Sequence, residues 1–218
     1  MMKNETIISF NNYTKSFKNE VVLNKVNLEF KKGGFYGIIG KNGSGKSILF
    51  KAICGFLKPT EGYVVVNGKK IGIDVDFPDK LGAMIEKPGF LPNYSGFENL
   101  KYLAEIQNII NDKKIYEVMH LVNLHPLSDK KVKNYSLGMK QRLGIAQAIM
   151  ENPDIIILDE PMNGLDREGV LLIRGILKEL NDIGKTIIIT SHYEEDISEL
   201  CHEVYKIEDG KVLLYNSK

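Results

Sequence analysis

The sequence has little of what would place it outside the cell or inside a membrane. It contains only two cysteines, Cys54 and Cys201, so neither a disulfide framework nor a cysteine metal site is expected. No apolar run approaches the roughly 18 residues needed to cross a bilayer, and Met1–Phe10 lacks the apolar core of a signal peptide. These absences predict a cytoplasmic protein whose cysteines pack as small apolar side chains, attached to a membrane only through a partner.

The charge balance also argues against a strongly basic surface. Lysine and arginine total 29 against 28 aspartates and glutamates, so no nucleic-acid partner is expected. A chain of 218 residues, with 43% hydrophobic content, is long enough to form one sizeable core or two tightly joined subdomains.

The most informative segment is the glycine-rich stretch Gly40–Ser47, with the sequence GKNGSGKS. It follows Phe35–Ile39, which is typical of a buried strand, and precedes Ile48–Cys54, which is typical of a helix. In this context the pattern G-x-x-x-x-G-K-[ST] predicts a phosphate loop, because glycines let backbone N–H groups turn inward and a helix N-terminus adds positive partial charge. Lys46 is expected to reach the β- and γ-phosphates of a nucleotide, and Ser47 to ligate Mg²⁺. The residues predicted to bind nucleotide here are Asn42, Gly43, Ser44, Gly45, Lys46, Ser47 and Ile48.

A second motif places two acids at the end of a buried strand. The run Ile155–Leu158 is wholly apolar and is followed by Asp159 and Glu160. Because α/β proteins bind ligands at the carboxyl edge of the sheet, we expect Asp159 to hold Mg²⁺ and Glu160 to polarise the attacking water. The competing interpretation is a surface pair of acids that only caps the strand.

The hydrophobic pattern divides the chain into three regions. Short strand candidates dominate residues 1–87, apolar residues at helical spacing dominate 88–152, and apolar strands alternate with helices over 153–218. Continuous apolar strands separated by helices indicate a parallel α/β sheet. We therefore predict one domain over 1–218, with its core in the first and third regions and a helical insert at 88–152. The expected strands include Ile7–Phe10, Val26–Phe30, Tyr63–Val66, Leu81–Ile85, Ile155–Leu158, Ile187–Ile189 and a closing hairpin over 204–214.

A third segment, Tyr135–Arg142, opens a helix for which Ser136 is a suitable N-cap. From physics alone an ordinary capped helix is the favoured interpretation, although the exposed N–H groups could bind an anion. The segment lies shortly before the two-acid strand, however, and Ser136–Lys140 resembles the signature sequence of ABC-type ATPases. That resemblance implies that Ser136 and Gly138 contact the nucleotide.

The resemblance to ABC-type ATPases extends over nearly the whole chain. Gly40–Ser47 is similar to the family's Walker A motif and Ile155–Glu160 to its Walker B motif. Asn163–Asp166 is similar to the D-loop, which implies that Asp166 belongs to the nucleotide site. Several motifs in the family's order are far more specific than any one of them.

Two further positions take their roles from the resemblance. His192 follows a buried strand and is similar to the family's switch histidine, which implies contact with the γ-phosphate. Otherwise it would be a solvated side chain. Phe17 stands where the family stacks an aromatic ring on adenine; the alternatives are that Phe17 belongs to the core, or that nearby Tyr13 takes this role.

Three departures from the family pattern bear on the site. Ile48 stands where the family often has threonine, which affects one hydrogen bond to the α-phosphate. The signature reads Ser-Leu-Gly-Met-Lys where the commoner form is Ser-Gly-Gly-Gln, which affects two of its contacts. Glu86 replaces the family's usual glutamine, and its carboxylate could ligate Mg²⁺ and orient the catalytic water. The alternative for Glu86 is a surface Glu-Lys pair before Pro88. This glutamate variant, together with the run YSLGMKQRL over Tyr135–Leu143, resembles the ATPases of lantibiotic-immunity and bacitracin-type peptide exporters.

The resemblance implies an α/β phosphate-loop NTPase with a RecA-like core, an antiparallel β region and a helical insert. Its chemistry would be hydrolysis of MgATP by in-line attack of water. Two such chains would form a head-to-tail dimer on an integral membrane permease, at the inner face of the plasma membrane, and export antimicrobial peptides or similar drugs. One alternative is a soluble ABC-type ATPase acting on DNA or ribosomes. A second is a phosphate-loop kinase, which has no use for the signature, the D-loop or His192.

Overall fold

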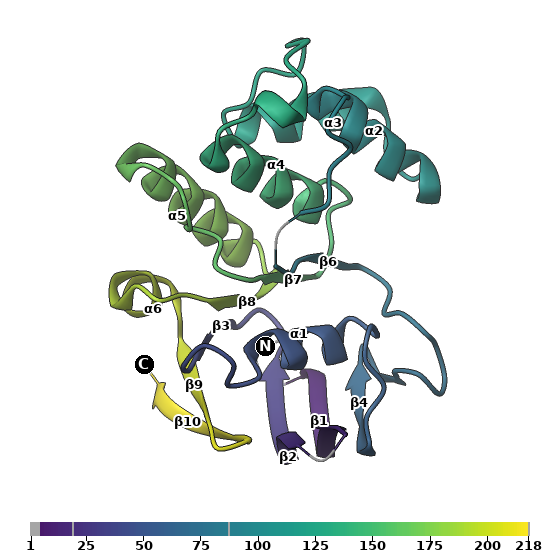
Figure 1. The fold of residues 1–218 in the computed structure, drawn as a ribbon, viewed down its shortest axis with the longest axis vertical. Coiled ribbons are helices and arrows are strands. Elements are labelled where there is room, and N and C mark those ends of the chain that lie inside the picture. The colour runs from purple at the N-terminus through teal and green to yellow at the C-terminus, as the bar shows by residue number, and fades with distance from the viewer. Residues whose placement is uncertain (1–4, 19, 87, 218) are drawn as a thin grey trace.

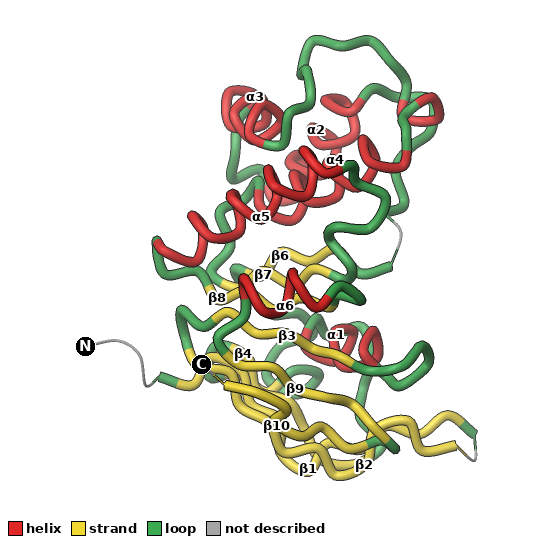
Figure 2. The backbone as a smooth tube through the Cα atoms, turned by 90° about the vertical axis from the view of Figure 1, so that its left-hand side faces the viewer, coloured by secondary structure: helices red, strands yellow, loops and turns green. Residues whose placement is uncertain are grey.

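The computed structural model describes residues 5–18, 20–86 and 88–217. Its helices between residues 96 and 149 gather at one end, and the strands between residues 6 and 66 include those that form the opposite end (Figures 1 and 2). A central sheet lies between the two. No helix in the described ranges is both long and apolar enough to span a membrane.

An antiparallel sheet of four strands forms the end opposite the helices. The two long strands extend beyond the predicted Ile7–Phe10 and Val26–Phe30. Register shifts on either side of Tyr13 let the strand pairing continue through polar residues, where apolar and polar residues no longer alternate strictly. The sheet order is β2 (Glu20–Lys31), β1 (Thr6–Phe17), β4 (Glu61–Val66) and β5 (Lys69–Lys70).

The central sheet has six strands and is parallel except at one edge, where the last two strands form an antiparallel hairpin. Its order is β10 (Lys211–Ser217), β9 (Glu203–Glu208), β3 (Phe35–Ile39), β8 (Thr186–Thr190), β7 (Ile155–Leu158) and β6 (Leu81–Met84). Since β8 lies between β3 and β7, the segments that follow these three strands meet at one carboxyl edge.

Helices cover both faces of the central sheet. One face is covered by α1 (Lys46–Ile53), on the side of the antiparallel sheet. The opposite face is covered by α5 (Arg167–Asp182) and α6 (Glu194–Leu200), and beyond it the helical end holds α2 (Gly96–Gln107), α3 (Asp112–Leu121), the 3₁₀ turn η1 (Val132–Asn134) and α4 (Leu137–Ile149). The sequence pattern missed α6, because its seven residues are too few to show a helical period.

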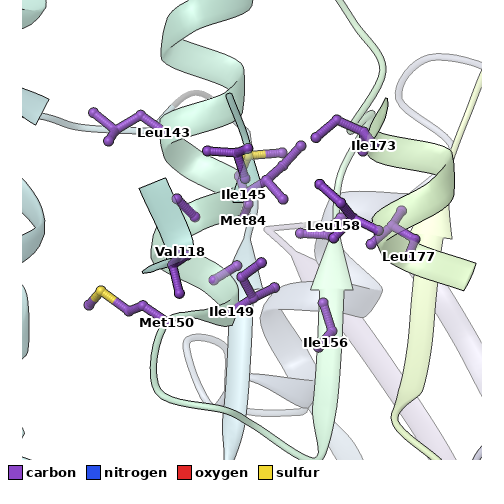
Figure 3. Packing of buried hydrophobic residues seen from close by; sticks show 14 of the residues in the cluster. Met84, Val118, Leu143, Ile145, Ile149, Met150, Ile156, Leu158, Ile173 and Leu177 are labelled. Atoms are coloured by element: carbon purple, nitrogen blue, oxygen red, sulfur yellow. The ribbon is translucent and has the colours of Figure 1, made fainter. Parts of the chain in front are cut away.

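The core has two parts, one on each face of the central sheet. Along β7, Ile156 and Leu158 face the helical side, where they pack near Ile145 and Ile173 (Figure 3). Ile155 and Ile157 alternate to the other face, against α1 and the antiparallel sheet. This alternation explains why β7 reads as a continuous apolar run, and it confirms the predicted parallel sheet. Cys54 and Cys201 are both buried, as predicted.

Candidate active site

The phosphate loop leaves β3 and enters α1. Gly45, the N-cap of α1, has a left-handed φ of 106°, and no side chain caps the helix. This conformation favours glycine, and a Cβ atom here would also lie only 3.2 Å from side-chain atoms of Leu23 and Val22. The first N–H groups of α1 are therefore left for a ligand.

Two polar side chains of the loop are arranged for an anion. Lys46 Nζ donates to the carbonyl oxygens of Gly40 and Lys41, at 2.8 and 3.2 Å, so the ammonium lies over its own loop. Ser44 Oγ is buried, and within the described part of the chain it has no hydrogen-bond partner. A buried hydroxyl without a partner fits a site whose partner is a ligand.

Asp159, which follows β7, is hydrogen-bonded both to the start of α1 and to the end of β8. Its Oδ2 accepts a hydrogen bond from Ser47 Oγ at 2.9 Å, and its Oδ1 accepts one from Thr190 Oγ1 at 2.7 Å. Thr190 Oγ1 in turn accepts from the backbone N–H of Glu160 at 2.8 Å. The structure thus brings together the hydroxyl and the carboxylate predicted to hold Mg²⁺, and this oxygen donor set suits that ion. Thr190, which the sequence analysis gave no role, fixes both acids.

Glu160 faces the switch loop, which we define as residues 190–193. Its Oε2 accepts from the backbone N–H of His192 at 3.2 Å, and His192 Nε2 lies 3.2 Å from Oε1. Oε1 is buried and makes no well-aligned hydrogen bond within the described residues. Burial raises the pKa of Glu160 even though His192 acts in the opposite direction. A carboxylate with increased basicity and an open acceptor suits a base that polarises water.

Glu160 is also held through its backbone. Its φ of 52° lies in the left-handed region, which is uncommon for a residue with a side chain and often found at functional sites. The carbonyl oxygen of Glu160 accepts a hydrogen bond from Gln141 Nε2 of α4 at 2.8 Å. Gln141 was also missed as a site residue, since nothing in the sequence says which face of α4 points toward β7.

These residues surround an open hollow of about 280 Å³ at the carboxyl edge of the sheet. The lining residues come from the phosphate loop, the two-acid motif and the switch loop: Asn42, Gly43, Gly45, Lys46, Ser47, Ile48, Asp159, Glu160 and His192. Backbone donors, a lysine, a candidate metal site and a candidate base therefore face one space, which is what transfer of a phosphoryl group to water requires.

The signature residues lie elsewhere in the same chain. Ser136 caps α4 by accepting from the N–H of Met139 at 3.2 Å, and it is exposed. A Cβ atom on Gly138 would lie 3.0 Å from the carbonyl oxygen of Gly164, so the start of α4 packs against the D-loop, Asn163–Asp166. Asp166 caps α5. Neither Ser136, Gly138 nor Asp166 lines the hollow of its own chain.

The two aromatic candidates for adenine stacking differ in exposure. Tyr13 is fully buried and its hydroxyl donates to the carbonyl of Leu57 at 3.4 Å, so it belongs to the core and cannot stack on a ligand. Phe17 is 42% exposed at the end of β1, with Lys15 Nζ 5.0 Å from its ring centroid. Phe17 therefore stays the candidate for adenine.

Glu86 approaches the candidate metal site with its backbone and not with its carboxylate. Its backbone N–H points to Asp159 Oδ2 at 3.4 Å, but its exposed carboxylate pairs with Lys51 of α1. The carboxylate does not line the hollow. The structure thus shows a Glu-Lys pair, made with Lys51 of α1, at the same place where the backbone touches the candidate metal site.

The glycine-rich loop between β3 and α1, together with the acids at the end of β7, defines a phosphate-loop nucleoside triphosphatase. The profile described as ABC transporter matches residues 23–163. The ABC transporter ATP-binding protein YybJ of Bacillus subtilis is 44% identical over 201 residues, which are 92% of this chain and 92% of that protein. The chain therefore belongs to the ABC transporter family, and it is an ATPase.

Two relatives carry names that include a transported compound. The bacitracin transport ATP-binding protein BcrA of Enterococcus faecalis is 39% identical and is matched over 98% of this chain and 70% of its own length. The lantibiotic transport ATP-binding protein SrtF of Streptococcus pyogenes is 34% identical, over 95% and 90%. Among solved structures, a dimeric post-hydrolysis state of the ATP-binding cassette MJ0796 bound to ADP and Pi has a TM-score of 0.86 at 28% identity, over 96% of this chain and 98% of that one.

Proposed function

We propose that this chain is the ATP-hydrolysing subunit of a membrane transporter that exports antimicrobial peptides of the bacitracin or lantibiotic type. The observation that carries the substrate class is the similarity to BcrA and SrtF over nearly the whole chain. Both relatives are transport proteins, which favours a transporter subunit over a soluble ATPase acting on DNA or ribosomes.

The proposed chemistry follows from the hollow. Backbone N–H groups of the phosphate loop and Lys46 would bind the phosphates, and Ser47 and Asp159 would hold Mg²⁺, which neutralises phosphate charge when bound. Glu160 would orient and polarise the attacking water, and His192 would contact the γ-phosphate. Thr190 keeps Asp159 and Glu160 in register for these two tasks.

We infer a head-to-tail dimer because the exposed Ser136 and the partly buried Gly138 do not reach the hollow of their own chain. In such a dimer they would close the hollow of the second copy, or of a similar chain, over ATP. The dimeric cassette MJ0796 provides a structural precedent. The dimer would lie on the inner face of the plasma membrane, against a permease.

The surface proposed to receive the permease is an apolar cavity of about 660 Å³ between β6 and α2. At its rim the exposed rings of Phe56 and Phe77 touch, with centroids 6.0 Å apart. Ile85 and Pro88, on either side of Glu86 in the chain, form part of the wall. Movement there would pass directly to Asp159, to which Glu86 donates.

The transport role is tested in cells that produce the chain together with its membrane subunit. We expect increased resistance to bacitracin or to a lantibiotic, lost in Glu160→Gln. Phe77→Asp is expected to keep ATP hydrolysis by the isolated chain but to lose resistance, because a charge is placed on the docking surface. Unchanged sensitivity to both compounds in cells whose transporter still assembles would contradict the substrate class and leave the ATPase assignment standing.

Glu86 is tested by its dependence on Mg²⁺. If its oxygen serves the metal shell or the water, Glu86→Gln should retain much of the hydrolysis and Glu86→Ala should lose about 10–100-fold. The measurement is ATPase activity against Mg²⁺ concentration, and the wild type should respond more steeply than the glutamine variant because of its charge.

Asp79→Asn is a matched control, since it breaks a similarly exposed pair, with Lys69, elsewhere on the surface. If all Glu86 variants behave like this control, Glu86 is only the surface partner of Lys51.

A further inference from the structure

A buried ion pair joins α5 to α6 behind the switch loop. Arg174 of α5 donates from Nε and Nη2 to the same oxygen of Asp196, Oδ1, at 2.8 and 2.6 Å. Arg174 is 8% exposed and Asp196 1% exposed. The partly exposed Glu199 lies 3.2 Å from Nη1 of the same guanidinium. A buried charge pair is weak evidence for stability, because apolar residues of similar volume often stabilise as well. Its place beside the site therefore needs another explanation.

The second oxygen of Asp196 reaches the switch loop. Oδ2 accepts from Ser191 Oγ at 2.6 Å, and Ser191 Oγ accepts from the backbone N–H of Tyr193 at 3.0 Å. These bonds fix the residues on both sides of His192. Because His192 contacts both carboxylate oxygens of Glu160, an unbroken series of contacts runs from the buried guanidinium to the proposed base.

The opposite end of α5 begins in the D-loop. Asp166 caps the helix by accepting from the N–H of Gly169 at 2.9 Å, and the D-loop packs against the start of α4, next to Gly138. Two turns of helix, about 12 Å, separate Asp166 from Arg174. In both Figure 1 and Figure 2, α6 lies below α5. One rigid element thus connects the signature side of the chain with the ion pair behind the switch loop.

We propose that Arg174 is a positioning residue, which acts through Asp196 and Ser191 to hold His192 against Glu160. This inference rests on the catalytic roles proposed above for His192 and Glu160. The alternative is that the ion pair only fastens α6 to α5. The two differ in one respect: a positioning residue changes the chemical step through His192, whereas a fastening residue changes stability alone.

The test compares steady-state hydrolysis and ATP affinity of the full chain. Ser191→Ala breaks the connection and leaves the buried pair intact, so we expect kcat to fall by up to about 10²-fold while ATP affinity stays within about twofold. Arg174→Lys keeps the charge but loses the two-pronged contact, and it should fall in kcat by a smaller factor. The exposed Lys178, one turn further along α5 and 3.7 Å from Glu199, supplies the matched control Lys178→Met, which should match the wild type.

The background His192→Ala separates the two explanations. If Arg174 acts through His192, Arg174→Lys and Ser191→Ala should cause no further loss of kcat in that background. Full kcat in Ser191→Ala, or equal losses with and without His192, would overturn the positioning role while leaving the proposed mechanism in place. Unchanged hydrolysis in the single variant His192→Ala would overturn both the positioning role of Arg174 and the catalytic role proposed for His192. Thermal unfolding of Ser191→Ala, expected near the wild type, shows that the comparison is made on folded protein.

Discussion

Replacing Glu160 with glutamine is expected to lower ATP hydrolysis by about 10²–10⁴-fold and to leave ATP binding intact. The change keeps the size of the side chain and the backbone bonds to Thr190 and Gln141, but it removes the basic carboxylate. Burial raises the pKa of this carboxyl, so the loss concerns a group that the fold has made more basic than a solvated glutamate. With hydrolysis blocked, ATP should hold two chains together, which size-exclusion chromatography detects as a dimer.

A second half-buried glutamate supplies the control for this experiment. Burial also raises the pKa of Glu151, which lies just after α4 and does not line the hollow. Glu151→Gln should therefore hydrolyse ATP at the wild-type rate and show no trapped dimer. Wild-type turnover in Glu160→Gln would remove Glu160 from the catalytic role.

Lys46→Ala and Ser136→Arg are expected to fail in different ways. Lys46 would contribute a charge-assisted contact to the phosphates within its own chain, so its loss should weaken ATP binding by the monomer about 10–100-fold. Ser136→Arg should leave binding by the monomer nearly unchanged and abolish hydrolysis, because Ser136 would act on the nucleotide of the second copy. Calorimetric titration of ATP, beside ATPase assays, separates the two effects.

A second lysine of the phosphate loop, Lys41, controls for the loss of a positive charge without the loss of a phosphate contact. Lys41 is exposed and contributes only its backbone carbonyl to Lys46, so Lys41→Ala should bind ATP like the wild type. Equal loss of ATP affinity by the monomer in Lys46→Ala and Ser136→Arg would contradict the opposed-site dimer.

The parts of the site that sequence motifs predict are those carried by local geometry. The phosphate loop, Asp159 and Glu160 follow strands whose apolar runs identify them, and parallel pairing then brings them to one edge. The roles of Phe17 and His192 are predicted by the family resemblance, and the burial of Tyr13 excludes it as the ring that stacks on adenine.

What the sequence could not predict depends on side-chain direction. Thr190 and Gln141 reach the two-acid motif from elements far along the chain, and no periodicity reveals such contacts. For Glu86 the pattern predicted the right neighbourhood, but whether its carboxylate faces Asp159 or Lys51 depends on a rotamer. The short helix α6 is defined by tertiary contacts, including the pair between Arg174 and Asp196, more than by its own pattern.

Helix α4 has an unusual double attachment. At its start lies the exposed Ser136, proposed above to contact the nucleotide of a second copy. Little more than one turn later, Gln141 donates to the backbone carbonyl of Glu160 in the same chain. If two chains close on each other, a shift of α4 caused by nucleotide in one half would alter the base in the other half. Hydrolysis would then rise sigmoidally with ATP concentration, and Gln141→Ala would flatten that curve toward independent, hyperbolic behaviour.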